Sequence, residues 1–296
     1  MSPLARSIRS GAFVVTTELT PPKGTDLSGL FAKADVLKGL VDGINLTESP
    51  RARMAVEPTA VGRLLLERGC EPIVQFTMRD RIRIALQADI LGAAVLGISN
   101  VVFMGGDDPK LGDHPDAKGV FDITAVELLR AACALNSGRD MMGNALQGAT
   151  ALFLGATANP GAADLAREAE NTRRKIDAGA RFLQTQAVYD ADTLARFVDA
   201  VQPDGVALLA GVIPLKSAKM ARWLNDNLPG VCVPQPLIAE MDGVAGDAAA
   251  ELRTDIGIAA RTITAIRPLC AGVHLMTLGW EQHIPAILQA SGLARS

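Results

Sequence analysis

The feature that most constrains the fold is a repeated alternation, in which a short apolar run is followed by a longer segment of helical periodicity. Strands that alternate with helices predict βαβ units and a parallel sheet. Because the runs are nearly continuously apolar, both faces of that sheet should be covered. Strands are predicted at residues 13–20, 41–48, 71–80, 100–108, 149–159, 181–190, 206–214 and 271–280. Helices are predicted at residues 27–40, 124–135, 163–178, 191–201, 217–227, 246–266 and 284–293, and two more should end near residues 69 and 97.

The number of strands decides between a closed barrel and an open sheet. Residues 231–236 (VCVPQP) are a ninth candidate, but two prolines make this segment a poor central strand. Eight strand–helix units in a chain of this length fit a (β/α)8 TIM barrel better than an open doubly wound sheet. The first strand is also not followed by the G-x-G-x-x-G of dinucleotide-binding folds. Since no Pro/Gly/Ser-rich linker divides the chain, we predict a single α/β domain over residues 1–296.

Composition excludes several classes of function. The chain is 49% hydrophobic and carries a net charge of −3 with both signs interspersed, which argues against a nucleic-acid partner. The four cysteines are scattered without a C-x-x-C pair, so no metal site is expected. We expect reduced thiols in a cytoplasmic protein. No apolar run reaches the roughly 18 residues of a membrane span, and the N-terminus lacks the apolar core of a signal peptide.

In a barrel of this kind, the active site is built at the C-terminal ends of the strands. The residues at those ends are mostly amides, hydroxyls and carboxylates, which suits a neutral or heteroaromatic ligand better than a phosphosugar. They include Thr16, Thr17, Glu18, Asn45, Thr47, Glu48, Gln75, Thr77, Arg79, Asp80, Asp107, Asp108, Thr157, Asn159, Gln184, Gln186, His274 and Thr277.

Glu18 is the sharpest catalytic candidate, because it ends a β-branched strand and should be partly buried at the rim. A carboxyl group in such a place can act as a general acid near neutral pH, or it can pair with an arginine or cap backbone N–H groups. Gln184 and Gln186 lie two apart and therefore share one face of their strand. They could hold a flat polar ligand, or they could only close the end of the strand.

The aspartate-rich loop over residues 105–122 raises the question of a metal ion, but the calcium-loop pattern with its terminal Glu is absent. The pair Gly105–Gly106 suggests instead that the backbone must come close to a ligand near Asp107. A solvated loop with one functional aspartate is the favoured interpretation.

An ordered set of motifs then resembles the methylenetetrahydrofolate reductase family. The motifs are TTELTPP, GGDDP, DAGARFLQTQAVYD, GVIP and GVHLMTLGWE, and they span nearly the whole chain. GDHPDAKGVFD is similar to the short bacterial type. The resemblance implies a barrel that holds a flavin, usually FAD with FMN also possible. It implies reduction of 5,10-methylenetetrahydrofolate to 5-methyltetrahydrofolate, or the reverse oxidation, with hydride transferred from flavin N5.

The resemblance also implies roles for individual residues. Glu18 matches the general acid that assists ring opening, and Asp107 matches the acidic residue beside flavin and pterin. Gln186, with Gln184 as a less certain neighbour, matches the amide that orients the pterin. The positions implied to contact the cofactor are Thr47, Gln75, Gly106, Asn159, Glu168 and Lys175.

Four positions depart from the family pattern. Gln75 stands where many relatives have His, Gly105 where Arg is common, Asn159 where Tyr occurs, and Ile82 where this branch usually has Asn. The changes at positions 75 and 105 favour an alternative, a folate- or pterin-binding accessory or methyl-transfer component without its own flavin. An unrelated pterin-dependent barrel enzyme is a third hypothesis. The expected reductant is NADH or an electron-transfer protein, and a homo-oligomer is possible.

Overall fold

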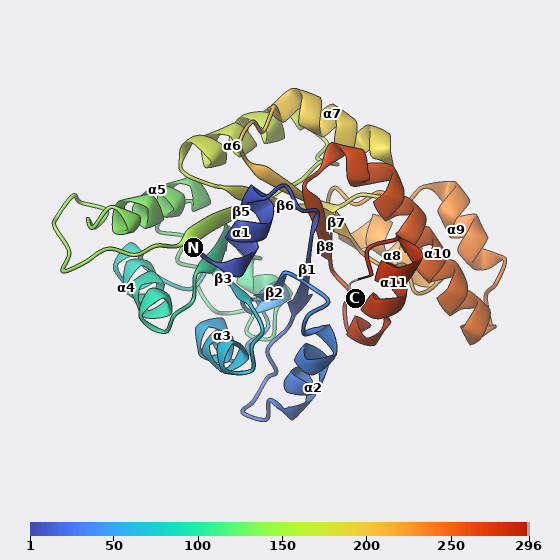
Figure 1. The fold of residues 1–296 in the computed structure, drawn as a ribbon, viewed down its shortest axis with the longest axis horizontal. Helices are drawn as coiled ribbons and strands as arrows, with labels where there is room; N and C mark the ends of the chain where they lie inside the picture. Colours follow the sequence, from blue (N-terminus) through green and yellow to red (C-terminus); the bar gives the residue numbers. More distant parts are fainter. Residues whose placement is uncertain (295–296) are drawn as a thin grey trace.

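A computed structural model of the chain, which describes residues 1–294, is a closed barrel of eight parallel strands in sequential order (Figure 1). Each strand pairs with the next one, and β8 pairs with β1. Every strand lies within one of the eight predicted runs, so the predicted (β/α)8 barrel is confirmed. The strands are β1 (Val14–Leu19), β2 (Gly43–Leu46), β3 (Pro72–Thr77), β4 (Asn100–Met104), β5 (Phe153–Ala158), β6 (Phe182–Ala187), β7 (Ala207–Val212) and β8 (Gly272–Leu275).

Helices surround the barrel, and two of those within residues 1–294 were not predicted, namely α1 and α9. Residues 231–236, rejected as a strand because of their prolines, form a loop up to Pro234 and then the first two residues of α9. The helices are α1 (Pro3–Arg9), α2 (Ser28–Leu37), α3 (Pro58–Glu67), α4 (Arg83–Val95), α5 (Ala125–Asn136), α6 (Leu165–Asp177), α7 (Ala191–Val201), α8 (Ala218–Asn227), α9 (Gln235–Asp242), α10 (Ala248–Ile266) and α11 (Ile284–Ala290).

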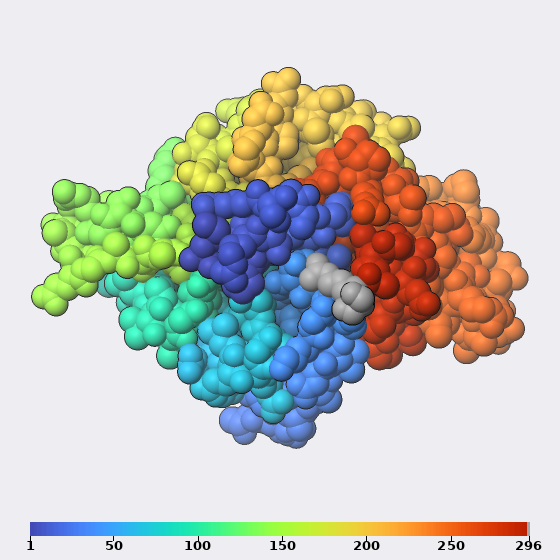
Figure 2. Space-filling view, viewed as in Figure 1, coloured from blue at the N-terminus to red at the C-terminus, as the bar shows by residue number. Residues whose placement is uncertain are grey.

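Helix α1 closes the N-terminal end of the barrel and lies across its centre in Figure 1. Ser2 begins the helix, because its hydroxyl accepts a hydrogen bond from the Ala5 N–H and Pro3 occupies the first helical position. The same hydroxyl donates to Asn100 Oδ1 at 2.6 Å, and Leu4 is fully buried among the apolar residues of the barrel interior. In Figure 2 the N-terminal segment fills the centre of this face. Access to the interior is therefore from the opposite end.

The barrel interior changes from apolar to polar along the strands. Successive inward positions on β1 are Val14 in the apolar interior cluster, Thr16 in a buried polar layer, and Glu18 at the C-terminal mouth. Phe182 and Gln184 repeat the order on β6. The intervening, outward positions pack against the helices. On these two strands the interior polar groups lie at the mouth end, whereas the buried Asn100 of β4 lies at the closed end and accepts a hydrogen bond from Ser2.

No helix within residues 1–294 is both long enough and apolar enough to cross a bilayer.

Candidate functional site

A cavity of about 1050 Å³ occupies the C-terminal mouth of the barrel. Its volume is slightly above the range of about 300–1,000 Å³ typical of ligand pockets, so a dinucleotide-sized ligand could fit. All of the residues that the sequence singled out as catalytic, substrate-binding or cofactor-binding line this one cavity. They are Glu18, Thr47, Gln75, Gly106, Asp107, Asn159, Glu168, Lys175, Gln184 and Gln186.

Glu18 projects from β1 into this cavity and has a histidine neighbour. Its Oε2 lies 3.8 Å from His274 Nε2 on β8, and its side chain is 17% exposed. Within residues 1–294 neither an arginine nor a backbone N–H group is bonded to this carboxylate, so the two structural alternatives weighed from the sequence are not realised. The other ring nitrogen of His274 lies 3.0 Å from Thr16 Oγ1.

The two glutamines of β6 occupy different levels of the barrel. Gln184 is buried and exchanges two hydrogen bonds with the amide of Asn45 on β2. Gln186 is half-buried, and its Oε1 accepts a hydrogen bond from the Ala187 N–H at 3.0 Å, close to a shift in the pairing of β6 with β7. The side-chain NH2 of Gln186 has no partner among the residues that the structure describes. It is therefore the amide that remains able to donate to a ligand.

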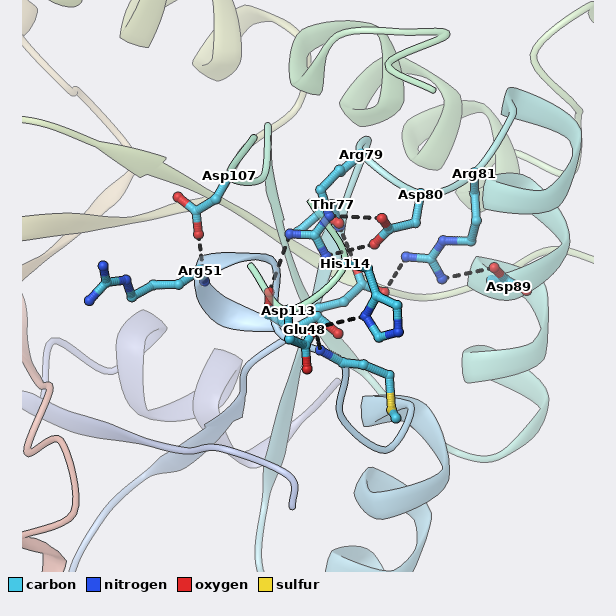
Figure 3. Close-up of polar contacts among 12 residues, drawn as sticks. Glu48, Arg51, Thr77, Arg79, Asp80, Arg81, Asp89, Asp107, Asp113 and His114 are labelled. Carbon is cyan, nitrogen blue, oxygen red and sulfur yellow. Dashed lines mark hydrogen bonds and ion pairs between the residues drawn. The ribbon is translucent and has the colours of Figure 1, made fainter. Parts of the chain in front are cut away.

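Asp107 organises the loop after β2 from the opposite side of the cavity. Its Oδ2 accepts a hydrogen bond from the backbone N–H of Arg51 at 2.7 Å (Figure 3). The Arg51 guanidinium lies 5.6 Å from the centre of the Trp223 ring on α8. Asp107 thus positions this loop, and its other carboxylate oxygen has no hydrogen-bond partner among the described residues.

A second aspartate, Asp113, joins three loops at the rim. It accepts hydrogen bonds from Lys23 Nζ, from the Met54 N–H and from the His114 ring. These partners, Lys23 first, hold the pKa of Asp113 well below its usual range. The loops after β1, β2 and β4 are connected through a single carboxylate.

The loop after β2 is conformationally constrained. Ser49, Arg51 and Ala52 all have left-handed backbone angles, with φ of 44°, 55° and 53°. Such angles are costly for residues other than glycine and are often found where a chain clamps a ligand. The carbonyl of Ala52 also approaches Gly112 so closely that a Cβ atom at that glycine would lie 1.8 Å from it. The β2 and β4 loops therefore touch through their backbones.

Glu48, at the end of β2, is occupied by structural contacts. Its carboxylate accepts hydrogen bonds from the Thr77 N–H and from Arg81, which also pairs with Asp89 at 2.9 Å (Figure 3). Burial raises the pKa of Glu48, and the Arg81 charge opposes that shift. Nearby, Arg79 forms a bidentate pair with Asp80. These groups fix the strand ends and leave little bonding capacity for a ligand.

The wall beyond β3 to β6 carries polar groups suited to a flat heteroaromatic ligand. Thr77 Oγ1 and Asn159 Oδ1 are buried without a hydrogen-bond partner within residues 1–294. Gly106, with φ of 90°, brings the backbone so close to Thr77 that a Cβ would lie 3.0 Å from its side chain. Lys175 donates to the Thr157 carbonyl at 2.7 Å, and burial lowers its pKa. These unpartnered buried oxygens lie in the same cavity wall as the close backbone approach at Gly106. A flavin, which has many hydrogen-bonding groups along its edges, fits such a wall.

Some cavity residues were not identified from the sequence. Arg51 and Trp223 are remote from each other in the chain and meet only through the fold. Trp223 offered one usable signal, since it is one of only two tryptophans in a chain with 4% aromatic residues. Met276, an apolar residue at the mouth end of β8, offered none.

The chain is similar in sequence to known methylenetetrahydrofolate reductases. A family model described as methylenetetrahydrofolate reductase matches residues 4–292. Methylenetetrahydrofolate reductase 1 of Schizosaccharomyces pombe is 26% identical over 144 residues, which cover 44% of this chain and 22% of that protein. Methylenetetrahydrofolate reductase (NADH) 1 of Zea mays is 28% identical over 214 residues, 67% of this chain and 34% of that protein. The matched regions thus make up about a third or less of these curated relatives.

A solved structure shares the architecture at lower sequence identity. An uncharacterized protein from Clostridium thermocellum that binds two copies of 5-methyl-5,6,7,8-tetrahydrofolic acid aligns with a TM-score of 0.60. The alignment covers 99% of both chains at 15% identity. A likeness at this identity shows a common fold.

Proposed function

Because the chain belongs to the methylenetetrahydrofolate reductase family, we propose that it is a flavin-dependent enzyme that reduces 5,10-methylenetetrahydrofolate to 5-methyltetrahydrofolate, or catalyses the reverse oxidation. The observation that carries this proposal is the convergence of Glu18, Asp107 and Gln186 on one cavity with the polar wall around Lys175.

The flavin, which we propose is FAD rather than FMN, would be held by the wall from β2 to β6. The groups that fit it are Thr47, Gln75, Gly106, Asn159, Glu168 and Lys175. Glu168 is itself held in place, because its Oε1 accepts hydrogen bonds from the Asn159 N–H and the Thr172 hydroxyl. When bound, the flavin supplies the hydride.

Glu18 would supply the proton that opens the five-membered ring of the substrate. Its carboxyl group faces the cavity and is shielded on one side by His274. Asp107 would place a negative charge beside the cation that ring opening creates. Gln186 would donate its NH2 group to the polar edge of the pterin.

Substitution of Glu18 by Gln tests this assignment. The amide keeps the shape of the side chain but is a far weaker acid, so folate reduction should fall by about 10²- to 10⁴-fold. Flavin reduction by NADH or dithionite should continue at the normal rate, measured anaerobically from the loss of yellow colour. Glu67→Gln, an exposed change outside the cavity, is the control. Normal folate turnover by the Glu18 variant would contradict the assigned role.

The alternative of a folate-binding component without its own flavin has specific support in Gln75 and Gly105. A Cβ at Gly105 would meet nothing within 4 Å, so the fold leaves room for the side chain that many relatives have there. The two functions differ in one simple measurement. The flavoenzyme should be yellow when purified, or bind added flavin, whereas the accessory component should bind 5-methyltetrahydrofolate and stay colourless.

The physiological reductant in this proposal is NADH or an electron-transfer protein, and the reaction would take place in the cytoplasm.

A further inference from the structure

A buried polar layer lies directly below the mouth of the barrel. Thr16 and Asn45 are fully buried, and Gln184 and His274 are each 3% exposed. The layer beneath is apolar, so these polar groups find their partners within the layer or at the mouth above it.

Asn45 and Gln184 form a reciprocal amide pair across the barrel, from β2 to β6. Asn45 Nδ2 donates to Gln184 Oε1 at 2.6 Å, and Gln184 Nε2 donates to Asn45 Oδ1 at 3.0 Å. The second N–H of Gln184 is thereby aimed at Thr16 Oγ1 and His274 Nδ1, each 3.4 Å away. The amide pair thus serves two further groups in the layer, Thr16 and His274.

The contacts of His274 Nδ1 favour one direction. Thr16 Oγ1 lies 3.0 Å from Nδ1 and 3.4 Å from the Val273 carbonyl, so an unprotonated Nδ1 is the nearer acceptor for its single hydrogen. The Gln184 amide can donate a proton to the same nitrogen. A neutral imidazole has one donor and one acceptor nitrogen, so an accepting Nδ1 places the proton on Nε2. Nε2 is the nitrogen that faces Glu18, 3.8 Å from its Oε2.

We propose that the Asn45–Gln184 pair fixes His274 in the Nε2–H tautomer and so keeps a hydrogen-bond donor beside the Glu18 carboxyl. The inference rests on the proposed role of Glu18. Asn45 and Gln184 are positioning residues, because they act on Glu18 only through His274. Without these two amides, Nδ1 can carry the proton instead. Nε2 then presents a lone pair to the Glu18 carboxylate and cannot donate a hydrogen bond to it.

Nitrogen NMR of the protein labelled at histidine tests the tautomer without substrate or flavin. The chain has only three histidines, so His114→Asn and His283→Asn assign the remaining signals to His274. At about pH 8.5, where an ordinary imidazole is neutral, wild-type His274 should show a pyrrole-like Nε2 and a pyridine-like Nδ1. Gln184→Met should move His274 to the other tautomer or to a mixture. An unchanged tautomer in this variant would overturn the proposal.

Two further variants separate positioning from folding. Asn45→Leu combined with Gln184→Leu removes both amides, leaves neither unsatisfied, and should still release the tautomer. Asn100→Leu removes a buried amide at the other end of the barrel and should leave the His274 tautomer unchanged. Release of the tautomer by Asn100→Leu would overturn the proposal, as would its retention in the double variant.

Kinetics then connect the tautomer to the reaction. Gln184→Met should slow the folate half-reaction by about 10-fold, with flavin reduction unchanged. If Glu18→Gln remains active while Gln184→Met still shifts the tautomer, the proposed role of Glu18 as the acid fails and the tautomer assignment stands. If Glu18→Gln is inactive and the tautomer does not move, the reverse holds.

Discussion

At the scale of single residues, the partners of three carboxylates at the mouth distinguish their roles. Glu48 is held by a backbone N–H and by Arg81, and Asp107 commits one oxygen to the loop after β2. Within residues 1–294, Glu18 has only a long contact, which is with His274. The carboxylate with the fewest partners is the one most able to exchange a proton with a ligand, which is why Glu18 rather than Glu48 is the proposed acid.

Two adjacent glycines, Gly105 and Gly106, test whether the cavity wall proposed to hold the flavin depends on a close backbone approach. Gly106 has a φ of 90°, and a Cβ there would lie 3.0 Å from Thr77 and 3.1 Å from Arg79. Gly106→Ala should cost about 1–3 kcal/mol of stability and displace the backbone beside the flavin. We expect flavin affinity to fall by about 10-fold, measured by fluorescence titration.

The control for this change is Gly105→Ala, which places a Cβ in open space without an unfavourable φ. It should leave both thermal stability and flavin affinity nearly unchanged. Equal effects of the two substitutions would show that the close approach at Gly106 does not matter.

The pairing of Asn45 with Gln184 shows what the sequence could not provide. Their type and strand positions were predictable, because polar residues at the mouth end of an apolar strand stand out. Their contact was not, since the two residues are 139 positions apart and meet only when β2 and β6 face each other across the closed barrel. The histidine neighbour of Glu18 was hidden for the same reason.

At the scale of secondary structure, the strands were predictable because each is a compact apolar run that needs no tertiary information. The two helices that were missed are both short. Helix α1 has seven residues and is recognisable mainly from Ser2 and Pro3 at its start. Helix α9 follows a proline-containing loop and packs mainly on α8 and α10. Short helices fixed by packing leave a weak pattern in sequence.

The loop after β2 carries the cations that are open to a ligand. Five basic residues line the cavity, and three are engaged: Lys23 with Asp113, Arg79 with Asp80, and Lys175 with a carbonyl oxygen. Arg51 and Arg53 have no carboxylate partner within the part of the chain that the structure describes. Their position at the rim suits the anionic tail of a folate.

Removal of both charges should therefore weaken folate binding selectively. We expect Arg51→Gln combined with Arg53→Gln to raise the KM for folate by about 10-fold at about 20 mM salt, with little change in kcat, and to reduce the dependence of KM on salt. Steady-state kinetics at low and high salt measure this. Lys110→Gln with Lys118→Gln, which are exposed outside the cavity, should have no such effect. An identical salt dependence in the two double variants would rule out the rim as the site of the tail.

At the scale of the whole molecule, the two ends of the barrel have different roles: the N-terminal half contributes mainly to stability and the C-terminal half carries the candidate site. The N-terminal half is closed by α1 and filled with apolar side chains, and the C-terminal half holds the polar layer and the cavity. Polar groups can be kept in the interior because each one below the mouth has a partner from another strand. A change in the lower half should accordingly affect stability before it affects ligand binding.

Asp255 on α10 provides a test of how this molecule responds to pH. Its carboxylate is 1% exposed and accepts a hydrogen bond from the Leu215 N–H at 2.6 Å, which ties α10 to the loop after β7. Burial raises the pKa of Asp255 from 3.8 to about 6. Between these values the folded protein holds a proton that the unfolded chain has lost, so the free energy of unfolding should fall as the pH rises. Two pKa units correspond to about 3 kcal/mol.

Asp255→Asn keeps an oxygen for the Leu215 N–H but cannot ionise. Relative to wild type, the variant should therefore gain about 3 kcal/mol between about pH 4 and pH 7, as measured by urea denaturation at several pH values. Asp226→Asn, an exposed change on α8, should give a curve parallel to that of wild type. A parallel curve for Asp255→Asn would mean that this carboxyl group is already ionised at pH 4 in the folded protein. The effect of burial on its pKa would then be offset by the hydrogen bonds from the loop after β7. The contact between α10 and that loop would contribute equally to stability at every pH.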